Sequence, residues 1–175
     1  MQKLKTSEIQ RITTEEFKNT QKIPLVVVLD NVRSLHNIGS VFRTCDAFLV
    51  EKILLCGVSG TPPNAEIHKT ALGAEFSVEW QYFEDTLSAI ELLKNQNFTI
   101  ISVEQATGST NIADFRTEKN AKYAVIFGNE VKGVQQQIVS ASDLCLEIPQ
   151  FGTKHSLNVS VSAGIVIWEM FRKMK

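Results

Sequence analysis

Apolar strand-like stretches alternate with helix-like stretches along the whole 175-residue chain. Most of the strand-like stretches are short, nearly continuous apolar runs, which is typical of strands buried on both faces of a parallel sheet. The pattern predicts strands at 25–29, 52–56, 77–82, 98–103, 123–127 and 144–148. It predicts helices at 7–18, 37–48, 65–72 and 85–95, after Val134, and from Ser156 onward. We therefore expect an α/β fold with a mostly parallel sheet and helices on both faces.

The chain shows no internal repeat, low-complexity tract or linker, so residues 1–175 are expected to form a single domain, with residues 1–23 as a helical N-terminal extension. No apolar run is long enough to cross a membrane, and Met1–Lys5 lacks the apolar core of a secretory signal. Cys45, Cys56 and Cys145 form no CxxC pair, which is typical of reduced thiols. A cytoplasmic location is expected.

The formal net charge of −1 provides no global basic field for binding a nucleic acid. Contacts with RNA would have to come from local patches. One such patch would form if the two ends of the chain lie close together, from Lys3, Lys5, Arg11, Arg172, Lys173 and Lys175. The charges alone favour the alternative of an ordinary solvated surface of mixed sign.

Sheets of this kind bind ligands beyond the carboxyl ends of their strands, and residues 29–43 run from a strand end through a polar turn into a helix. Asn37 is expected to be the N-cap of that helix. Arg43 lies off the apolar stripe, one turn after Gly39, whose missing side chain would leave room for a bulky anion such as a phosphodiester. The alternative is a capped helix with a surface arginine. The stripe that should face the sheet consists of Ile38, Val41, Phe42, Cys45 and Leu49.

A second polar block follows the strand at 123–127. Gly128 would permit a close backbone approach to a ligand, and Asn129 and Glu130 would project from the end of the strand. The alternative is ordinary strand-to-helix turn chemistry.

The third block runs from 146 to 164, through a loop with proline and glycine into the terminal helix. Ser156 is expected to cap this helix, which leaves Asn158 in the first turn without a capping role although it is a poor helix former. Ser160 and Gly164 give the helix a small face suited to packing against another helix. An apolar stripe is formed by Leu157, Val161, Ile165 and Trp168.

Taken in order, these blocks resemble the three signature motifs of the SpoU/TrmH family of SPOUT methyltransferases. The resemblance covers roughly Leu25 to Met170. The family pattern N-x-G-x-x-x-R matches Asn37, Gly39 and Arg43, and G-x-E matches Gly128 and Glu130. The third motif matches Ile148, Pro149, Gly152 and the unbroken run Ser156-Leu157-Asn158-Val159-Ser160-Val161, and the segment 69–74 resembles the small-residue segment of the family.

The resemblance implies a C-terminal deep trefoil knot, here at about residues 98–175, with S-adenosylmethionine bound in the knot largely by backbone groups. Such a knot is an exception to the usual absence of knots. A G-x-G-x-x-G loop binds a pyrophosphate, and this cofactor has none. The absence of such a loop is therefore consistent with S-adenosylmethionine. The cofactor-binding positions implied by the family are Val103, Glu104, Gly128, Ile148 and Leu157.

The implied activity is methyl transfer from S-adenosylmethionine to a ribose 2′-hydroxyl in RNA, with no metal. Arg43 would be the principal catalytic residue, binding a phosphate and stabilising the developing oxyanion. Arginine is always protonated and cannot act as the general base, so the residue that accepts the hydroxyl proton is not assigned. Asn37, Glu130, Ser156 and Asn158 would orient Arg43 and the ribose. The family also implies a homodimer formed through the terminal helix; Arg43 would then serve the partner's cofactor, although action within one subunit stays open.

The chain lacks the extra N-terminal domain of several rRNA enzymes of the family, which favours tRNA over rRNA as the substrate. The main alternative is a catalytically inactive RNA-binding member of the same fold. A nicotinamide-dependent dehydrogenase is disfavoured because no glycine-rich fingerprint is present. A serine hydrolase built from Asp143, His155 and Ser156 lacks G-x-S-x-G, and His36, His68 and His155 lack the spacing of metal ligands.

Overall fold

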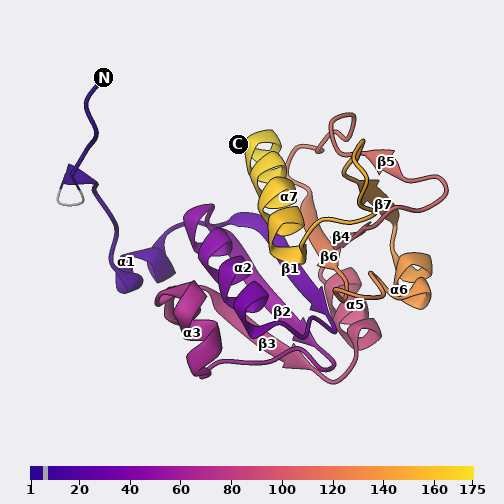
Figure 1. Ribbon diagram of the computed structural model, residues 1–175, viewed down its shortest axis with the longest axis horizontal. Coiled ribbons are helices and arrows are strands. Elements are labelled where there is room, and N and C mark those ends of the chain that lie inside the picture. The colour runs from indigo at the N-terminus through magenta and orange to yellow at the C-terminus, as the bar shows by residue number, and fades with distance from the viewer. Residues whose placement is uncertain (6–7) are drawn as a thin grey trace.

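The computed structural model describes residues 1–5 and 8–175, and its centre is a seven-stranded sheet (Figure 1). The strand order is β3-β2-β1-β6-β4-β7-β5, and every pairing between these strands is parallel. The predicted α/β fold with a mostly parallel sheet is therefore confirmed. The strands are β1 (Ile23–Asp30), β2 (Val50–Cys56), β3 (Glu79–Phe83), β4 (Phe98–Val103), β5 (Thr110–Asn111), β6 (Lys122–Phe127) and β7 (Leu144–Glu147).

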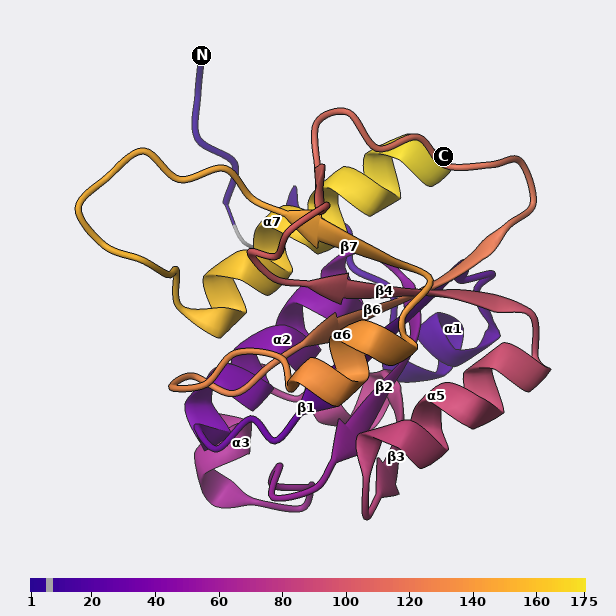
Figure 2. The same ribbon diagram turned by 90° about the vertical axis from the view of Figure 1, so that its right-hand side faces the viewer.

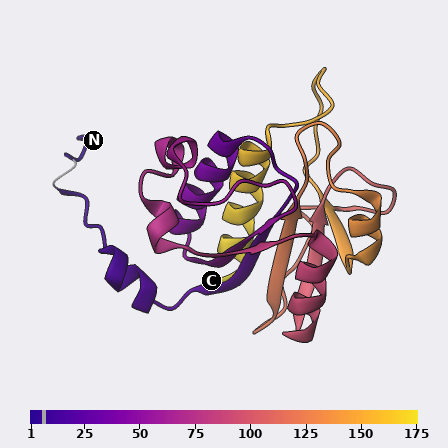
Figure 3. The ribbon, with the colours of Figure 1, turned by 90° about the horizontal axis from the view of Figure 1, so that it is seen from below.

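Helices cover both faces of the sheet (Figure 3). Side chains of successive β1 residues enter two separate cores, because neighbouring residues of a strand point to opposite faces. Leu25, Val27 and Leu29 pack with α1–α4 and α7, whereas Val26 and Val28 pack with α5 and α6. The helices are α1 (Thr14–Asn19), α2 (Leu35–Ala47), α3 (Ala65–Ala71), α4 (Ala74–Ser77), α5 (Thr86–Asn95), α6 (Gln136–Ala141) and α7 (Val159–Met174).

The first helix is shorter than the sequence pattern predicts. The prediction began at Ser7, which lies outside the described residues, but α1 begins at Thr14. Thr13 and Glu16 form a capping box in which each side chain accepts a hydrogen bond from the backbone N–H of the other. The short elements α4 and β5 were not predicted.

Two predicted N-caps are wrong. Ser34, not Asn37, caps α2, and its Oγ accepts a hydrogen bond from the Asn37 N–H at 3.3 Å. Asn158, not Ser156, caps α7, and its Oδ1 accepts from the Ser160 N–H at 2.9 Å. Asn158 was predicted to have no capping role, and this prediction is wrong. Residues 151–158 are all exposed and form a wide loop between β7 and α7 (Figure 2).

The two ends of the chain lie apart in all three views of the ribbon (Figures 1–3). The basic patch predicted from both ends is therefore absent from the described part of this chain. Arg172 and Lys173 instead pair with Glu169 at 2.8 and 3.0 Å.

Cys45 and Cys56 are buried free thiols and Cys145 is a half-buried one. No helix in the described ranges is long and apolar enough to cross a membrane.

Candidate functional site

A cavity of about 660 Å³ opens at the carboxyl ends of three adjacent strands, β6, β4 and β7. This is the edge where parallel α/β sheets bind ligands. The walls are the residues that follow β4, the loop after β6, and the loop from β7 into α7. The cavity is lined by every residue predicted to bind the cofactor, which are Val103, Glu104, Gly128, Ile148 and Leu157, and also by Glu130, Ser156 and Asn158.

The loop after β6 folds back on itself beside the cavity. Asn129 and Gly133 form an antiparallel bridge through two backbone hydrogen bonds of 3.0 and 2.8 Å. A Cβ on Gly128 would lie 2.1 Å from the Gly133 carbonyl carbon and 2.1 Å from the Val134 nitrogen. Gly128 is thus required by the return of its own loop, whereas the sequence analysis attributed it to the approach of a ligand.

Glu104 fixes the opposite wall. Its carboxylate accepts hydrogen bonds from the backbone N–H of Gln105 and of Val134, both at 2.9 Å. These bonds join the end of β4 to the loop after β6. Both donors are neutral backbone groups, so these bonds fix the position of the Glu104 carboxylate without neutralising its charge.

Glu130 binds the turn at the start of α2. Its carboxylate accepts hydrogen bonds from the backbone N–H of Arg33 at 3.1 Å and of Ser34 at 3.0 Å, and from the Asn37 side-chain amide at 3.2 Å. Burial opposes ionisation of this carboxyl, but the hydrogen bonds outweigh that effect and lower the pKa of Glu130. Glu130 is thus held as a carboxylate.

The same network reaches the terminal helix. Asn158 Nδ2 donates to Asn37 Oδ1 at 3.2 Å. The path Glu130–Asn37–Asn158 therefore connects all three sequence blocks at the edge of the cavity. The structure brings together each of the predicted site residues except Arg43.

Arg43 does not line this cavity. It lies on the exposed side of α2 and lines two other hollows, of about 560 and 480 Å³. The space over Gly39 is also not free, since a Cβ there would lie 2.2 Å from both Ile67 O and Thr70 Oγ1. The prediction that Gly39 leaves room for an anion is wrong, because the glycine lets α3 pack closely on α2.

Asp30, at the end of β1, was not predicted from the sequence to have a role. Its fully buried carboxylate accepts hydrogen bonds from Thr86 Oγ1 at 2.6 Å and Gln135 Nε2 at 3.1 Å. Asp30 ties β1 to the segments that begin α5 and α6. An acidic residue that ends an otherwise apolar strand is the signal that would have indicated it.

The lining of the cavity carries more negative than positive charge. Glu104 and Glu130 are acidic and Lys132 is basic. Val103, Ile148 and Leu157 supply apolar surface. This combination suits a ligand that has a flat apolar part and a cationic part. Among residues 1–5 and 8–175, no cluster of three His, Cys, Asp or Glu side chains is arranged to hold a metal ion.

The SpoU rRNA Methylase family model matches residues 24–168. A tRNA (guanosine(18)-2'-O)-methyltransferase of Thermus thermophilus is 31% identical over 168 residues, which cover 95% of this chain and 84% of the relative. A 23S rRNA (guanosine-2'-O-)-methyltransferase of Neisseria meningitidis is 30% identical, over 90% of this chain and 62% of the relative. Among solved structures, an AdoMet-bound rRNA methyltransferase from Sinorhizobium meliloti matches with a TM-score of 0.80 and 25% identity, over 89% of this chain and 59% of that one.

Proposed function

The chain belongs to the SpoU methylase family, and we propose that it uses S-adenosylmethionine to methylate a ribose 2′-hydroxyl in RNA. The observation that carries this proposal is the hydrogen-bonded path Glu130–Asn37–Asn158, which joins all three family motifs at one cavity. Relatives that act on tRNA and on rRNA are both similar to this chain. We propose tRNA as the substrate; in support, the tRNA enzyme is 31% identical over 95% of this chain and the rRNA enzyme 30% identical over 90%.

The cavity fits S-adenosylmethionine in size and chemistry. Its volume of about 660 Å³ lies within the usual range for small-molecule sites. Val103, Ile148 and Leu157 would hold the adenine, and the carboxylates of Glu104 and Glu130 favour a ligand that carries sulfonium and ammonium charges. When bound, the cofactor supplies a methyl group that its positive sulfur already activates.

We propose that Arg43 binds a substrate phosphate and stabilises the negative charge that develops on the 2′-oxygen. Arg43 lines the hollows on the exposed side of α2 and not the cavity of its own subunit. This position supports action in trans, with Arg43 of one subunit completing the site of its partner. The general base is not assigned to Arg43, since a guanidinium does not accept a proton at neutral pH.

The terminal helix is the proposed dimer surface. Val161, Ile165 and Trp168 form an apolar stripe on α7 and are 50%, 38% and 49% exposed. Trp168 is stacked on Phe171 and packs against Phe48, the C-cap residue of α2, which continues the apolar surface from α7 to the end of α2. A continuous apolar surface of this kind is typical of an interface between subunits.

Asn37, Glu130 and Asn158 are proposed to position the substrate ribose and the start of α2. The carboxylate of Glu130 accepts hydrogen bonds from two backbone N–H groups of the turn before α2. These bonds fix the position of the turn that leads into the helix of Arg43. Ser156 lines the cavity beside Asn158 and would contact the ribose or the cofactor.

We further propose that residues 98–175 form the trefoil knot of the family. In support, α7 leaves the β7 side of the sheet and returns to pack on α2 and β1. The knot would be refuted by an experimental structure in which the C-terminal segment does not thread through a loop formed by the preceding chain.

The test of the proposed function is methyl transfer by the purified protein to unmodified tRNA and rRNA, with labelled S-adenosylmethionine as the donor. Methyl incorporation at a ribose 2′-oxygen is the expected result. Saturable binding of S-adenosylmethionine and RNA with no transfer to any RNA would instead favour the catalytically inactive RNA-binding alternative.

A further inference from the structure

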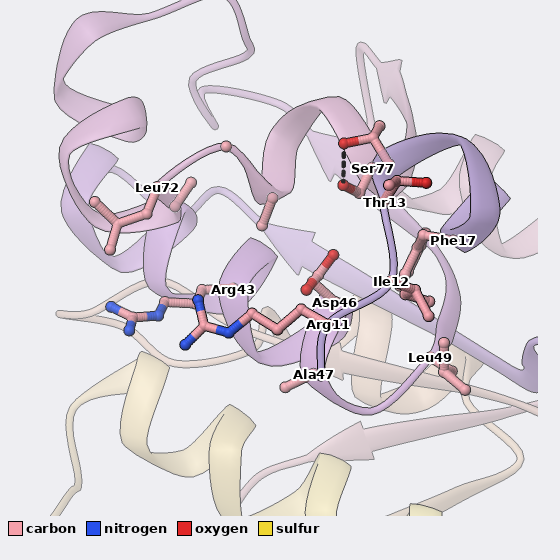
Figure 4. Close-up of a pocket in the computed structure, with 14 residues that line it drawn as sticks. Arg11, Ile12, Thr13, Phe17, Arg43, Asp46, Ala47, Leu49, Leu72 and Ser77 are labelled. Atoms are coloured by element: carbon pink, nitrogen blue, oxygen red, sulfur yellow. Dashed lines mark hydrogen bonds between the residues drawn. The ribbon is translucent and has the colours of Figure 1, made fainter. Parts of the chain in front are cut away.

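A second cavity, of about 560 Å³, lies between the N-terminal segment and the exposed side of α2 (Figure 4). It is separate from the cavity at the strand ends, and Arg43 lines it together with Arg11 of the N-terminal segment. The two side chains extend toward the same side of the cavity (Figure 4). Arg11 lies before residues 24–168, the part of the chain that matches the family model, so the family motifs assign it no role.

Local structure holds the N-terminal segment in this place. Phe17 of α1 is only 3% exposed and belongs to the core shared by α2 and α4. The capping box of Thr13 and Glu16 fixes where the helix begins, and therefore where the extended chain before it leaves. Arg11 is two residues before this cap, so its backbone is tied to a buried anchor while its side chain is exposed.

Neither guanidinium group has a partner among residues 1–5 and 8–175. Within the described ranges, neither Arg11 nor Arg43 makes an ion pair or a side-chain hydrogen bond. Asp46 is the carboxylate that lines the cavity, but it forms no ion pair with either arginine. Burial raises the pKa of Asp46, and the groups that oppose this rise are the Ser77 hydroxyl and the charge of Lys22. Two arginines that share a cavity without a pairing carboxylate form a site for an anion.

The chemistry of the surroundings favours a phosphodiester. Thr14 supplies a hydroxyl group to the same cavity. The Thr13 hydroxyl donates to Glu16 and the Ser77 hydroxyl donates to Thr14. Arg43 also lines the neighbouring hollow with Lys69 of α3, whose ammonium pairs with Glu66 at 2.6 Å. Guanidinium and hydroxyl groups are usual contacts to a nucleic-acid backbone, and this cavity offers two guanidinium groups beside the Thr14 hydroxyl.

We propose that Arg11 binds, together with Arg43, a phosphodiester of the RNA next to the ribose that is methylated. The N-terminal segment is thus a substrate-binding element. This inference rests on the proposed function, since it takes RNA as the ligand and Arg43 as part of the reaction site.

The experiment is a titration of fluorescently labelled, unmodified tRNA transcripts with the full chain at several salt concentrations. Arg11→Ala is expected to weaken binding about tenfold and to reduce the slope of log affinity against log salt by about one. Arg11→Lys keeps the charge but not the bidentate geometry, so it should recover only part of the affinity. Lys18→Ala is the matched control, because it removes one positive charge from the same segment without touching the cavity.

Two further readouts separate this inference from the proposed function. Calorimetric affinity for S-adenosylmethionine should not change in Arg11→Ala, because Arg11 does not line the cofactor cavity. In methyl transfer, Arg11→Ala should raise KM for RNA with little change in kcat. If no RNA is methylated, the proposed function fails, and the binding titration still decides the role of Arg11. Equal losses in Arg11→Ala and Lys18→Ala, or no tRNA binding by the wild type, would overturn the inference.

Discussion

Asn158 and Asn37 are 121 residues apart in the chain, yet the Asn158 side-chain amide donates a hydrogen bond to Asn37 Oδ1 at 3.2 Å. Asn158 also caps α7, and Asn37 also donates to Glu130. One asparagine pair therefore fixes the start of the terminal helix relative to the first turns of α2. The pair thereby joins the edge of the cavity at the strand ends to the helix that carries Arg43.

Replacing Arg43 should remove methyl transfer but leave cofactor binding intact. Arg43→Ala is expected to lower kcat at least 100-fold, since the role proposed for the guanidinium includes stabilising the charge that develops in the transition state. Arg43 does not line the cavity proposed to bind the cofactor, so calorimetric affinity for S-adenosylmethionine should stay near that of the wild type. Arg116→Ala, which removes an exposed arginine elsewhere, is the control. A large loss of cofactor affinity in Arg43→Ala would refute the role given to Arg43.

Glu130→Gln should destabilise the fold in a pH-dependent way. In the folded chain the pKa of Glu130 lies below its ordinary value of 4.5, with the hydrogen bonds from Ser34, Arg33 and Asn37 outweighing burial. A carboxyl with a lowered folded pKa stabilises the fold above its unfolded pKa and loses this contribution as the pH falls through the folded pKa. The difference in urea midpoint between wild type and Glu130→Gln should therefore be constant near neutral pH and shrink below about pH 4.5. A difference that does not change with pH would contradict the charged role of Glu130.

Gly39→Ala should lower the stability of the fold by about 1–3 kcal/mol, as overpacking does in other cores. The added Cβ would lie 2.2 Å from Ile67 O, a backbone atom of α3 that cannot rotate away. Chemical denaturation measures the loss. Gly152→Ala is the control, because nothing lies within 4 Å of a Cβ there. Equal stability of the two variants would show that α2 and α3 do not pack as closely as described.

A bulky residue at Gly164 should weaken the proposed dimer without harming the subunit. Outside the backbone of α7 and the two neighbouring residues, no atom of the described residues lies within 4 Å of a Cβ at Gly164, so Gly164→Leu is expected to fit within one subunit. Sedimentation should show a shift toward monomer for Gly164→Leu but not for Glu91→Leu on α5, and circular dichroism should show both folded. An unchanged sedimentation profile for Gly164→Leu would place the interface elsewhere.

The apolar pattern predicted six of the seven strands, and the resemblance to the family supplied the residues that line the cavity. Apolar runs such as 98–103 match β4 residue for residue, because burial on both faces leaves a clear signal. The ends of helices were harder to predict, since Ser34 and Asn37, or Ser156 and Asn158, are equally good caps until the path of the preceding loop is known. The role of Gly39 depends on a contact with α3 that no local pattern encodes.

The position of Arg43 was the main feature of the site that sequence could not give. Its motif places it six residues after Asn37 on one helix, but which side of α2 faces the cavity depends on how α7 and the loop after β6 pack. Arg11 was noted as part of a basic patch with the other chain end, whereas the structure brings it to the cavity of Arg43. Such pairings are set by tertiary packing and not by local propensity.

The most direct test of the account is to incubate the purified protein with labelled S-adenosylmethionine and unmodified tRNA, and then to digest the RNA with alkali. A ribose that carries a 2′-O-methyl group cannot attack its own phosphate, so the label should appear in an alkali-resistant dinucleotide. Label recovered in mononucleotides would show that a base is methylated and would contradict 2′-O-methylation. Transfer to neither tRNA nor rRNA would contradict the enzyme itself.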